Sequence, residues 1–295
     1  MSKKTFIRTL EFWVSDASGS LLEFGGGLFG ECRRFEAATS KLCFGRGEGL
    51  PGQAWEAGHP VMLTSLQAPA FRRAAAAQAE GLTCAIALPV WVESQLRSVT
   101  VLFCGDDQEH AGAIELWHND PDEGVDLTLD EGYYGTTGDT FEFLSRSTAF
   151  RAGTGLPGLT WARKGPVFMP DLGRGSGFLR ADSAVKVGIN RGLGLPCASV
   201  DGQHYVLALL SALATPLARR IDVWEPDALN ARLAHSFGFS EDGDAPADAA
   251  AAASPIDGDT LEQVYRSGVP QLHEQTVLLP VGAQGDVRAV LGLTL

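Results

Sequence analysis

The chain has 295 residues, of which 45% are hydrophobic and 20% charged, a globular composition long enough for two or three domains. Its formal net charge of −13 argues against sequence-independent nucleic-acid binding and against docking on anionic membranes, because like charges repel. The five cysteines are odd in number and form no CxxC pair, which is typical of a reducing compartment rather than a disulfide framework or a zinc site.

The N-terminal segment makes a poor signal peptide, because Arg8 and Glu11 interrupt its apolar run. The longest apolar stretch, residues 205–218, is too short to cross a bilayer and contains Pro216. We therefore expect a soluble, cytoplasmic protein.

The first predicted element is a strand that ends in tryptophan followed by acidic or polar residues, and it occurs three times. The sequence reads LEFWVSD at 10–16, IELWHND at 114–120 and IDVWEPD at 221–227. The tryptophans Trp13, Trp117 and Trp224 are 104 and 107 residues apart. Because a recurring spacing of this kind marks copies of one structural unit, we predict an internal repeat.

A Gly-Pro turn leading into a short helix is the second repeated element. It reads GEGLPGQAWEAGHPV at 47–61, GTGLPGLTWARKGPV at 153–167 and, in a degenerate form, GDTLEQVYRSGVPQL at 258–272. Pro51 and Pro157 fit the first helical position. The GxGxxG spacing in the first two copies is also that of a dinucleotide-binding loop. The internal proline and the missing βαβ pattern favour a helix-start turn, whose free N–H groups could still hold an anion.

A helix and a pair of strands follow. FRRAAAAQAEG at 71–81 and FLRADSAVKVG at 178–188 predict helices that stop at glycine. Alternating segments at 85–104, 193–210 and 277–295 predict strand pairs. The third copy lacks the helix, because only 10 residues separate Pro270 from Pro280. The Ala-rich stretch 241–254 predicts a loose linker inside this third copy.

Each full copy therefore predicts an α+β unit, an antiparallel sheet with helices on one face. We place the units at 1–108, 109–217 and 218–295, the third one shortened. An alternative stays open, in which the last strand of one copy forms a hairpin with the first strand of the next, so that each domain combines two copies. Cutting the chain near Ala111 should give a stable fragment in the first case and an unfolded one in the second.

These motifs resemble the GAF domain family of small-molecule sensors. The resemblance lies in the E-x-W strand, in GxGLPG followed by tryptophan, in Asp171 and Leu172 after the G-PV segment, and in the F-R-A helix before the [LI]P strand. It covers about two-thirds of the chain. It implies tandem GAF-like modules of the PAS or profilin-like kind, each with a helix-covered pocket. The ligand and any cofactor stay unknown, because members bind cyclic nucleotides, bilins, haem, amino acids or nothing.

The chain also departs from the family. The long helices that flank such domains and mediate dimers have no good counterpart in these residues, and we expect no output domain within them. The resemblance therefore implies a small-molecule ligand and signalling through a protein partner that carries the output function, with a homodimer as a further option.

Seven side chains are candidates for ligand binding. Arg73 and Arg180 hold equivalent positions, and a guanidinium pairs well with carboxylate or phosphate. The structural interpretation, which we favour, is an ion pair with a local acid, for example Asp171 for Arg180. Trp55 and Trp161 could stack on a ligand, although buried tryptophan is usually core. With the neighbouring aromatic residues the set is Trp55, Phe71, Arg73, Trp161, Asp171, Phe178 and Arg180.

We predict a non-enzymatic small-molecule sensor or signalling adaptor, with no catalytic residue and no metal ligand, because no nucleophile–base arrangement or metal motif stands out. Two alternatives stay open. One is a small redox enzyme that resembles free methionine sulfoxide reductase and uses Cys84 or Cys197. The other is a structural protein–protein interaction module whose pockets are filled by its own side chains. A structure without a cavity between the sheet and the helices at Phe71 and Phe178 would favour that last alternative.

Overall fold

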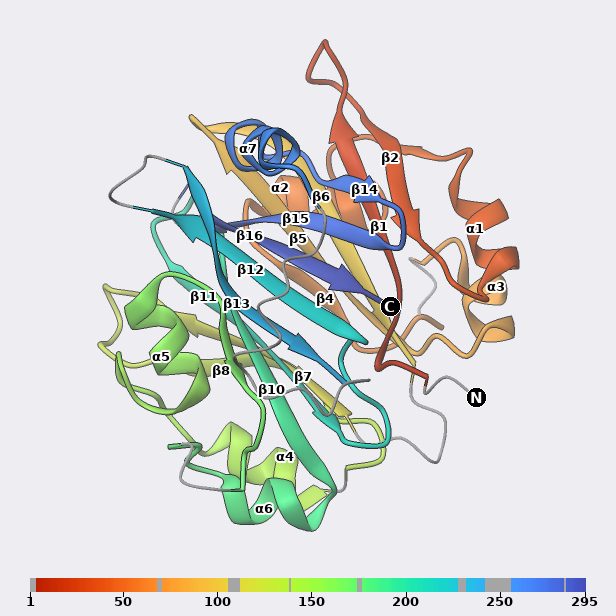
Figure 1. Cartoon of the computed structure of the whole chain (residues 1–295). Helices are drawn as coiled ribbons and strands as arrows, with labels where there is room; N and C mark the ends of the chain where they lie inside the picture. The colour runs from red at the N-terminus through yellow and green to blue at the C-terminus, as the bar shows by residue number, and fades with distance from the viewer. Residues whose placement is uncertain are drawn as a thin grey trace.

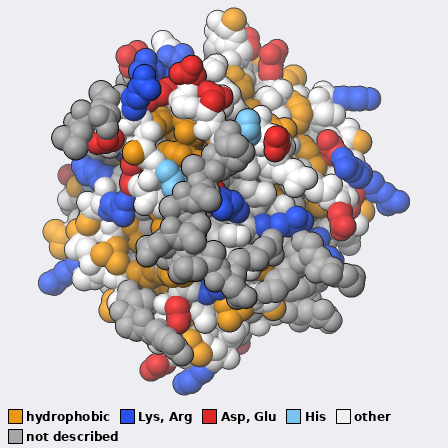
Figure 2. All heavy atoms as spheres, viewed as in Figure 1, with side chains coloured by type: hydrophobic (Ala, Val, Ile, Leu, Met, Phe, Trp, Pro, Cys, Tyr) orange, Lys and Arg blue, Asp and Glu red, His pale blue; other side chains and the backbone are white. Residues whose placement is uncertain are grey.

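The computed structural model describes residues 4–67, 71–105, 112–137, 139–173, 177–227, 232–241, 256–283 and 285–295. In this part of the chain there are sixteen strands and seven short helices, so sheet dominates. The strands lie in the middle of the molecule and the helices at its periphery (Figure 1). Acidic and basic side chains are interspersed over the same face (Figure 2). None of the described helices is long and apolar enough to cross a membrane.

The strands form three antiparallel sheets, each built from a consecutive stretch of chain. The orders are β3-β2-β1-β6-β5-β4, β8-β7-β11-β10-β9 and β13-β12-β16-β15-β14. Numbered within their own stretch, the second and third sheets share the order 2-1-5-4-3, and the first adds only the short strand β3 at its edge. We call the stretches 7–104, 112–212 and 220–294 units 1, 2 and 3.

The elements follow one another in a similar way in the three units. Unit 1 contains β1 (Ile7–Ser15), β2 (Leu22–Leu28), α1 (Arg33–Thr39), β3 (Cys43–Phe44), α2 (Gly49–Ala57), β4 (Val61–Leu63), α3 (Ala74–Ala79), β5 (Cys84–Val92) and β6 (Gln95–Cys104). Unit 2 contains β7 (Gly112–Asn119), β8 (Thr128–Tyr133), α4 (Asp139–Arg146), α5 (Gly155–Arg163), β9 (Val167–Met169), α6 (Ala181–Lys186), β10 (Ile189–Cys197) and β11 (His204–Ala212). Unit 3 contains β12 (Arg220–Pro226), β13 (Leu233–Ser240), α7 (Gly258–Ser267), β14 (Gln271–His273), β15 (Thr276–Ala283) and β16 (Asp286–Thr294).

The predicted order of elements is close to the observed one, with two differences. Helices α1 and α4 were not expected. In unit 3, β14 leads directly to β15 without a helix, as the short spacing between the prolines indicated. The predicted linker 241–254 lies, after Glu241, outside the described residues.

Strand pairing excludes the hairpin between successive copies. The last strand of unit 1, β6, pairs with β1 and β5 of its own sheet. The last strand of unit 2, β11, likewise pairs with β7 and β10. The alternative in which one copy pairs with the start of the next is therefore wrong, while the boundaries 1–108, 109–217 and 218–295 stay predictions.

Tryptophan occupies an equivalent position in all three sheets. In each case the register shifts immediately before it, as in a β-bulge, where the first strand pairs with the second. On the opposite side each tryptophan faces a valine of the last strand. The pairs are Trp13 with Val99, Trp117 with Val206 and Trp224 with Val290. Because a bulge bends a strand and increases its twist, the three sheets share the same local distortion.

Both faces of the sheets are buried, which explains the nearly continuous apolar strands. Inner-face residues such as Leu102, Leu207 and Leu291 belong to one core that all three units share. The outer faces carry separate cores, which include helix residues and surround Trp13, Trp117 and Trp224. Each unit therefore depends on the other two to cover its inner face.

The helix that follows the Gly-Pro turn begins two residues earlier than the prolines suggested. Helix α2 starts at Gly49, so Pro51 is its third residue, still within the first turn, where N–H groups have no intrahelical partner. The turn itself closes by a hydrogen bond from the Gly47 N–H to the Gly52 carbonyl at 2.8 Å. A Cβ at Gly52 would lie 2.1 Å from the Gly45 carbonyl oxygen, which accounts for glycine there.

The units contact one another in a closed ring, through the ends of these helices. The carbonyl of Gly58, after α2, accepts a hydrogen bond from the Val200 N–H of unit 2 at 3.1 Å. The carbonyl of Gly268, after α7, accepts one from the Ser98 hydroxyl of unit 1 at 2.7 Å. At the end of α5, Arg163 pairs with Glu225 of unit 3 at 2.6 Å. Three head-to-tail junctions of this kind close a ring, as in a heterologous trimer.

Candidate binding site

A buried ion pair occupies the space between the sheet and the helices of unit 1. Arg73, which precedes α3, binds both carboxylate oxygens of Glu11 on β1, at 2.6 and 2.8 Å. It also donates to the Thr39 hydroxyl of α1 at 2.5 Å. Arg73 is 6% exposed and Glu11 is fully buried. The rings of Phe35 and Phe71 lie 4.6 and 5.3 Å from the guanidinium carbon.

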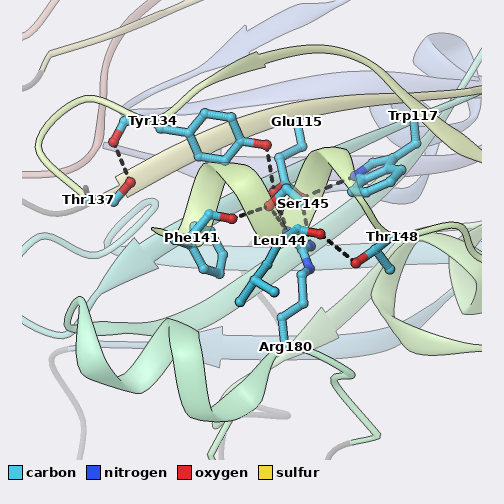
Figure 3. Close-up of polar contacts among 9 residues, drawn as sticks. All are labelled: Glu115, Trp117, Tyr134, Thr137, Phe141, Leu144, Ser145, Thr148 and Arg180. Carbon is cyan, nitrogen blue, oxygen red and sulfur yellow. Dashed lines mark hydrogen bonds and ion pairs between the residues drawn. The ribbon is translucent and has the colours of Figure 1, made fainter. Parts of the chain in front are cut away.

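Unit 2 repeats this arrangement (Figure 3). Arg180 binds both oxygens of Glu115 on β7, with 2.8 Å between Nη2 and Oε2, and donates to the Ser145 hydroxyl of α4. Trp117 and Tyr134 each donate a further hydrogen bond to this carboxylate at 3.1 Å. Burial by itself would raise the pKa of Glu115, but the charge and hydrogen bonds of Arg180 outweigh it and hold the pKa below the usual value.

The arginines thus form ion pairs, as we favoured, but with a different acid. The example of Asp171 as partner of Arg180 was wrong, since Arg180 binds Glu115 while Asp171 accepts the Gly173 N–H at 2.8 Å in a turn. The glutamate had been visible in the E-x-W strand. The hydroxyl partners Thr39 and Ser145 also lie in a repeated segment, which reads FEAAT at 35–39 and FEFLS at 141–145. We did not predict a role for this repeat.

In unit 3 the acid at the equivalent strand position has different ion-pair partners. Asp222 lies two residues before Trp224, as Glu11 does before Trp13. Its carboxylate binds Arg220 of the same strand at 2.6 and 2.7 Å and His235 of β13 at 2.8 Å. A local pair therefore replaces the long-range arginine in the unit that lacks the α3-type helix.

Trp55, at the end of α2, lines a cavity with a volume of about 710 Å³. The cavity, which we call the unit 1 cleft, lies between the turn after β1, the start of β6 and the end of α7. Arg97 contributes a buried Nε that has no hydrogen-bond partner in the described part of the chain. Asp16 is also on its wall, but its carboxylate is occupied by Ser18, Ser20 and Leu21. Trp55 and Arg97 thus line the same space.

Trp161 is the equivalent residue of unit 2, and it lines a cavity of only about 20 Å³. Its ring lies 5.4 Å from that of His204, which corresponds to Arg97. Burial, together with the charges of Lys164 and His118, lowers the pKa of His204. The seven predicted residues therefore do not form two matching pockets. Phe71, Arg73, Phe178 and Arg180 belong to the buried pairs, and ligand binding by any of the seven stays a prediction.

The two thiols named for the redox alternative, Cys84 and Cys197, are both buried. Of the five, only Cys43 is exposed. Burial raises the pKa of Cys32, that of Cys104 and that of Cys197, the last to about 12, so few thiolates form at neutral pH. Among the described residues, no group of His, Cys, Asp and Glu is placed to hold a metal ion.

Proteins similar to this chain were found only among solved structures. No family model and no curated protein matches the chain. A GAF domain of A. aeolicus nlh2 in an inactive state is 18% identical over 35% of this chain and 60% of its own, with a TM-score of 0.28. An NreA protein of Staphylococcus aureus mutated in its nitrate binding site is 17% identical over 34% of this chain and 74% of its own, with a TM-score of 0.28.

A third match is the free methionine-R-sulfoxide reductase of Neisseria meningitidis in complex with its substrate. It is 16% identical over 36% of this chain and 53% of its own, with a TM-score of 0.26. A GAF domain is thus among the structures that resemble part of the chain, as the motifs suggested. With overlaps this small, we take nothing about the ligand or activity of this chain from them.

Proposed function

We propose that the chain is a non-enzymatic small-molecule sensor or signalling adaptor of the cytoplasm, built from three tandem GAF-like α+β modules. The matching strand orders, the equivalent tryptophans and the twin Glu–Arg pairs support the tandem arrangement. Helices α2, α5 and α7 contact the last two strands of their own sheets, which supports modules with helices on one face. The boundaries 1–108, 109–217 and 218–295 belong to this proposal.

The observation that carries the proposal is the unit 1 cleft. The space under the α3-type and α6-type helices is taken by the buried Glu–Arg pairs, so a ligand there would have to displace a charge-paired arginine. In the unit 1 cleft, by contrast, Trp55 offers a stacking surface, and Arg97 contributes a cationic side chain to the wall. A ligand with a planar group and a carboxylate or carbonyl acceptor fits this combination.

Native mass spectrometry of freshly purified protein tests the proposal, because it shows a retained small molecule and the subunit count together. We expect a bound mass that is lost in Arg97→Gln and in Trp55→Ala. Arg288→Gln is the matched control, since Arg288 holds the corresponding strand position in unit 3. Protein without any bound mass, and with no thermal shift across a panel of aromatic carboxylic acids, would contradict ligand binding at the unit 1 cleft.

A second candidate function, protein–protein interaction, is favoured by one observation on unit 2. Phe143, on α4, is 68% exposed, and Leu179 and Val185, beside and on α6, are 63% and 52% exposed. Unit 1 has Ala37, Arg72 and Gln78 at the corresponding positions. An apolar surface that only one of two like units carries is typical of a contact site. Sedimentation velocity tests the homodimer form of this idea: Phe143→Asp should abolish concentration-dependent self-association, and a wild-type chain that stays monomeric would contradict it.

A further inference from the structure

Two arginines without ion-pair partners among the described residues line one cavity at the junction between units 3 and 1. The N–H groups of Phe6 and Ile7 donate to the carbonyls of Pro216 and Leu217 at 2.7 and 3.3 Å, which brings the segments before β1 and β12 side by side. Arg8 and Arg219 come one and two residues after these contacts. They hold corresponding positions in the two units, two residues before Leu10 and Ile221.

Both side chains line a cavity of about 440 Å³, separate from the unit 1 cleft. Other walls come from the turn between β2 and α1, the turn before β15 and the end of β16. Lys and Arg side chains reach the surface close to the point where Figure 1 places the C-terminus, as Figure 2 shows. The charged groups on the cavity wall are Lys4, Arg8, Arg33, Arg219, Glu31 and Glu36.

Two of the cationic side chains on the cavity wall have no ion-pair partner among the described residues. Arg33 is paired with Glu36 at 3.2 Å. Neither Arg8 nor Arg219 forms an ion pair within the described part of the chain, and the Nε of Arg219 is buried without a hydrogen-bond partner. Both side chains are only partly exposed, so water screens their repulsion incompletely. Two arginines that line one cavity without an ion-pair partner among the described residues suggest a bound counter-charge.

We infer that this cavity binds a small oxyanion, a carboxylate or a phosphate, held between the guanidinium groups of Arg8 and Arg219. Guanidinium donors match the oxygens of both ligand types and are the usual protein partners for them. The ligand would join unit 3 to unit 1 next to their strand contact. It would thereby stabilise the junction that closes the ring.

Thermal unfolding of the full chain in phosphate, in acetate and in chloride at equal ionic strength tests this inference. We expect one of the two oxyanions to raise the melting temperature by about 2 to 4 °C over chloride at ten times its dissociation constant. Phosphate and acetate thus distinguish the two ligand types. Equal melting temperatures in all three salts would overturn the inference.

Substitutions separate a binding role from a structural one. Arg8→Gln and Arg219→Gln should remove the oxyanion effect while keeping or raising the melting temperature in chloride, since each removes one of two repelling charges. Arg146→Gln, at an exposed site on α4, is the control and should keep the effect. Arg219→Lys should keep it in part, because the charge stays but the paired donors are lost. An oxyanion effect that survives Arg8→Gln and Arg219→Gln, or a lower melting temperature in chloride, would overturn the inference.

Discussion

Units 1 and 2 have nearly the same interior but differ where they meet their neighbours. At the junction of unit 1 with unit 2, three rings form a stack. His59, one residue after the α2 cap, lies 4.8 Å from the ring of Tyr205 with 8° between the planes. His118 lies 4.7 Å from the other side of Tyr205 at 29°. Of these rings, that of Tyr205 lies on the wall of the small cavity beside Trp161.

At the junction of unit 3 with unit 1 the corresponding side chains are small. Val269 follows the α7 cap as His59 follows the α2 cap, Ser98 replaces Tyr205, and Val14 replaces His118. Val14 and Val269 both line the unit 1 cleft of about 710 Å³. The junction with the ring stack thus has a cavity of about 20 Å³ beside Trp161, and the junction with small side chains has one of about 710 Å³ beside Trp55. We therefore regard the junctions, rather than the sheet-and-helix pockets, as the places where the units have diverged in function.

Removing unit 3 should have the largest effect. A chain that ends at Leu217 loses two of the three junctions and exposes the inner faces of two sheets, including Leu102 and Leu207, which are fully buried. We expect no cooperative unfolding transition and strong binding of a hydrophobic dye, because the shared core is open. A cooperative transition in circular dichroism would show that units 1 and 2 form a stable body through the ring stack alone. The same reasoning replaces our expectation of a stable fragment after a cut near Ala111: although each sheet is built from one copy, the inner face of unit 1 would be exposed, so the fragment should not fold.

Breaking either buried ion pair should lower the free energy of unfolding by nearly the same amount. Arg73→Ala and Arg180→Ala each leave a buried glutamate without its partner, and we expect each to lower the free energy of unfolding by about 3 to 5 kcal/mol. Urea denaturation measures it. Arg72→Ala is the control for the first variant, since its ion pair with Glu48 is exposed and should contribute less than about 1 kcal/mol. If the two variants lose strongly unequal amounts of unfolding free energy, the interiors of units 1 and 2 differ in energy although their geometry is similar.

The ring stack should contribute less than the ion pairs. His59→Val, which copies the side chain at the open junction, removes one ring contact and part of the buried surface. We expect a loss of about 1 to 2 kcal/mol in urea denaturation. The reverse change, Val269→His, places a ring at the edge of the unit 1 cleft and should exclude the proposed ligand. Unchanged ligand retention in Val269→His would mean that the ligand lies elsewhere.

Much of this architecture was predictable from sequence because it depends on local patterns. The strand that ends in Trp13, the GxGLPG turn and the glycine after each short helix determine backbone conformation close to themselves. Gly81 and Gly188, for example, have the positive φ angles of 70° and 83° expected after a helix. The spacing between Pro270 and Pro280 likewise predicted the missing helix of unit 3 correctly.

The rest depends on contacts between distant residues, which a single sequence does not reveal. Arg73 and Glu11 are 62 positions apart, and the residues near Arg73 in the sequence do not indicate that Glu11 is its partner. The alternation in residues 98–104 predicted a half-buried strand, whereas both faces of this strand are buried because three sheets share one core. The unit 1 cleft depends on Val269 meeting β6, a contact across 170 residues that the Ser98–Gly268 hydrogen bond records.

The smallest predicted effect is a difference in the pH dependence of stability between variants of His204 and Arg97, which hold corresponding positions. Because burial lowers the pKa of His204 in the native state, the unfolded chain, with the ordinary value of 6.5, takes up a proton first as the pH falls. Acidification through pH 6.5 therefore favours unfolding, while well above pH 6.5 the residue adds no pH dependence. In His204→Gln the loss of stability between about pH 7 and pH 5.5 should become shallower. Arg97→Gln should leave that slope unchanged, since a guanidinium stays charged throughout this range. Identical slopes in wild type and His204→Gln would mean that the histidine is as accessible to protons in the native state as in the unfolded one, and that the junction of units 1 and 2 is more open than its stacked rings indicate.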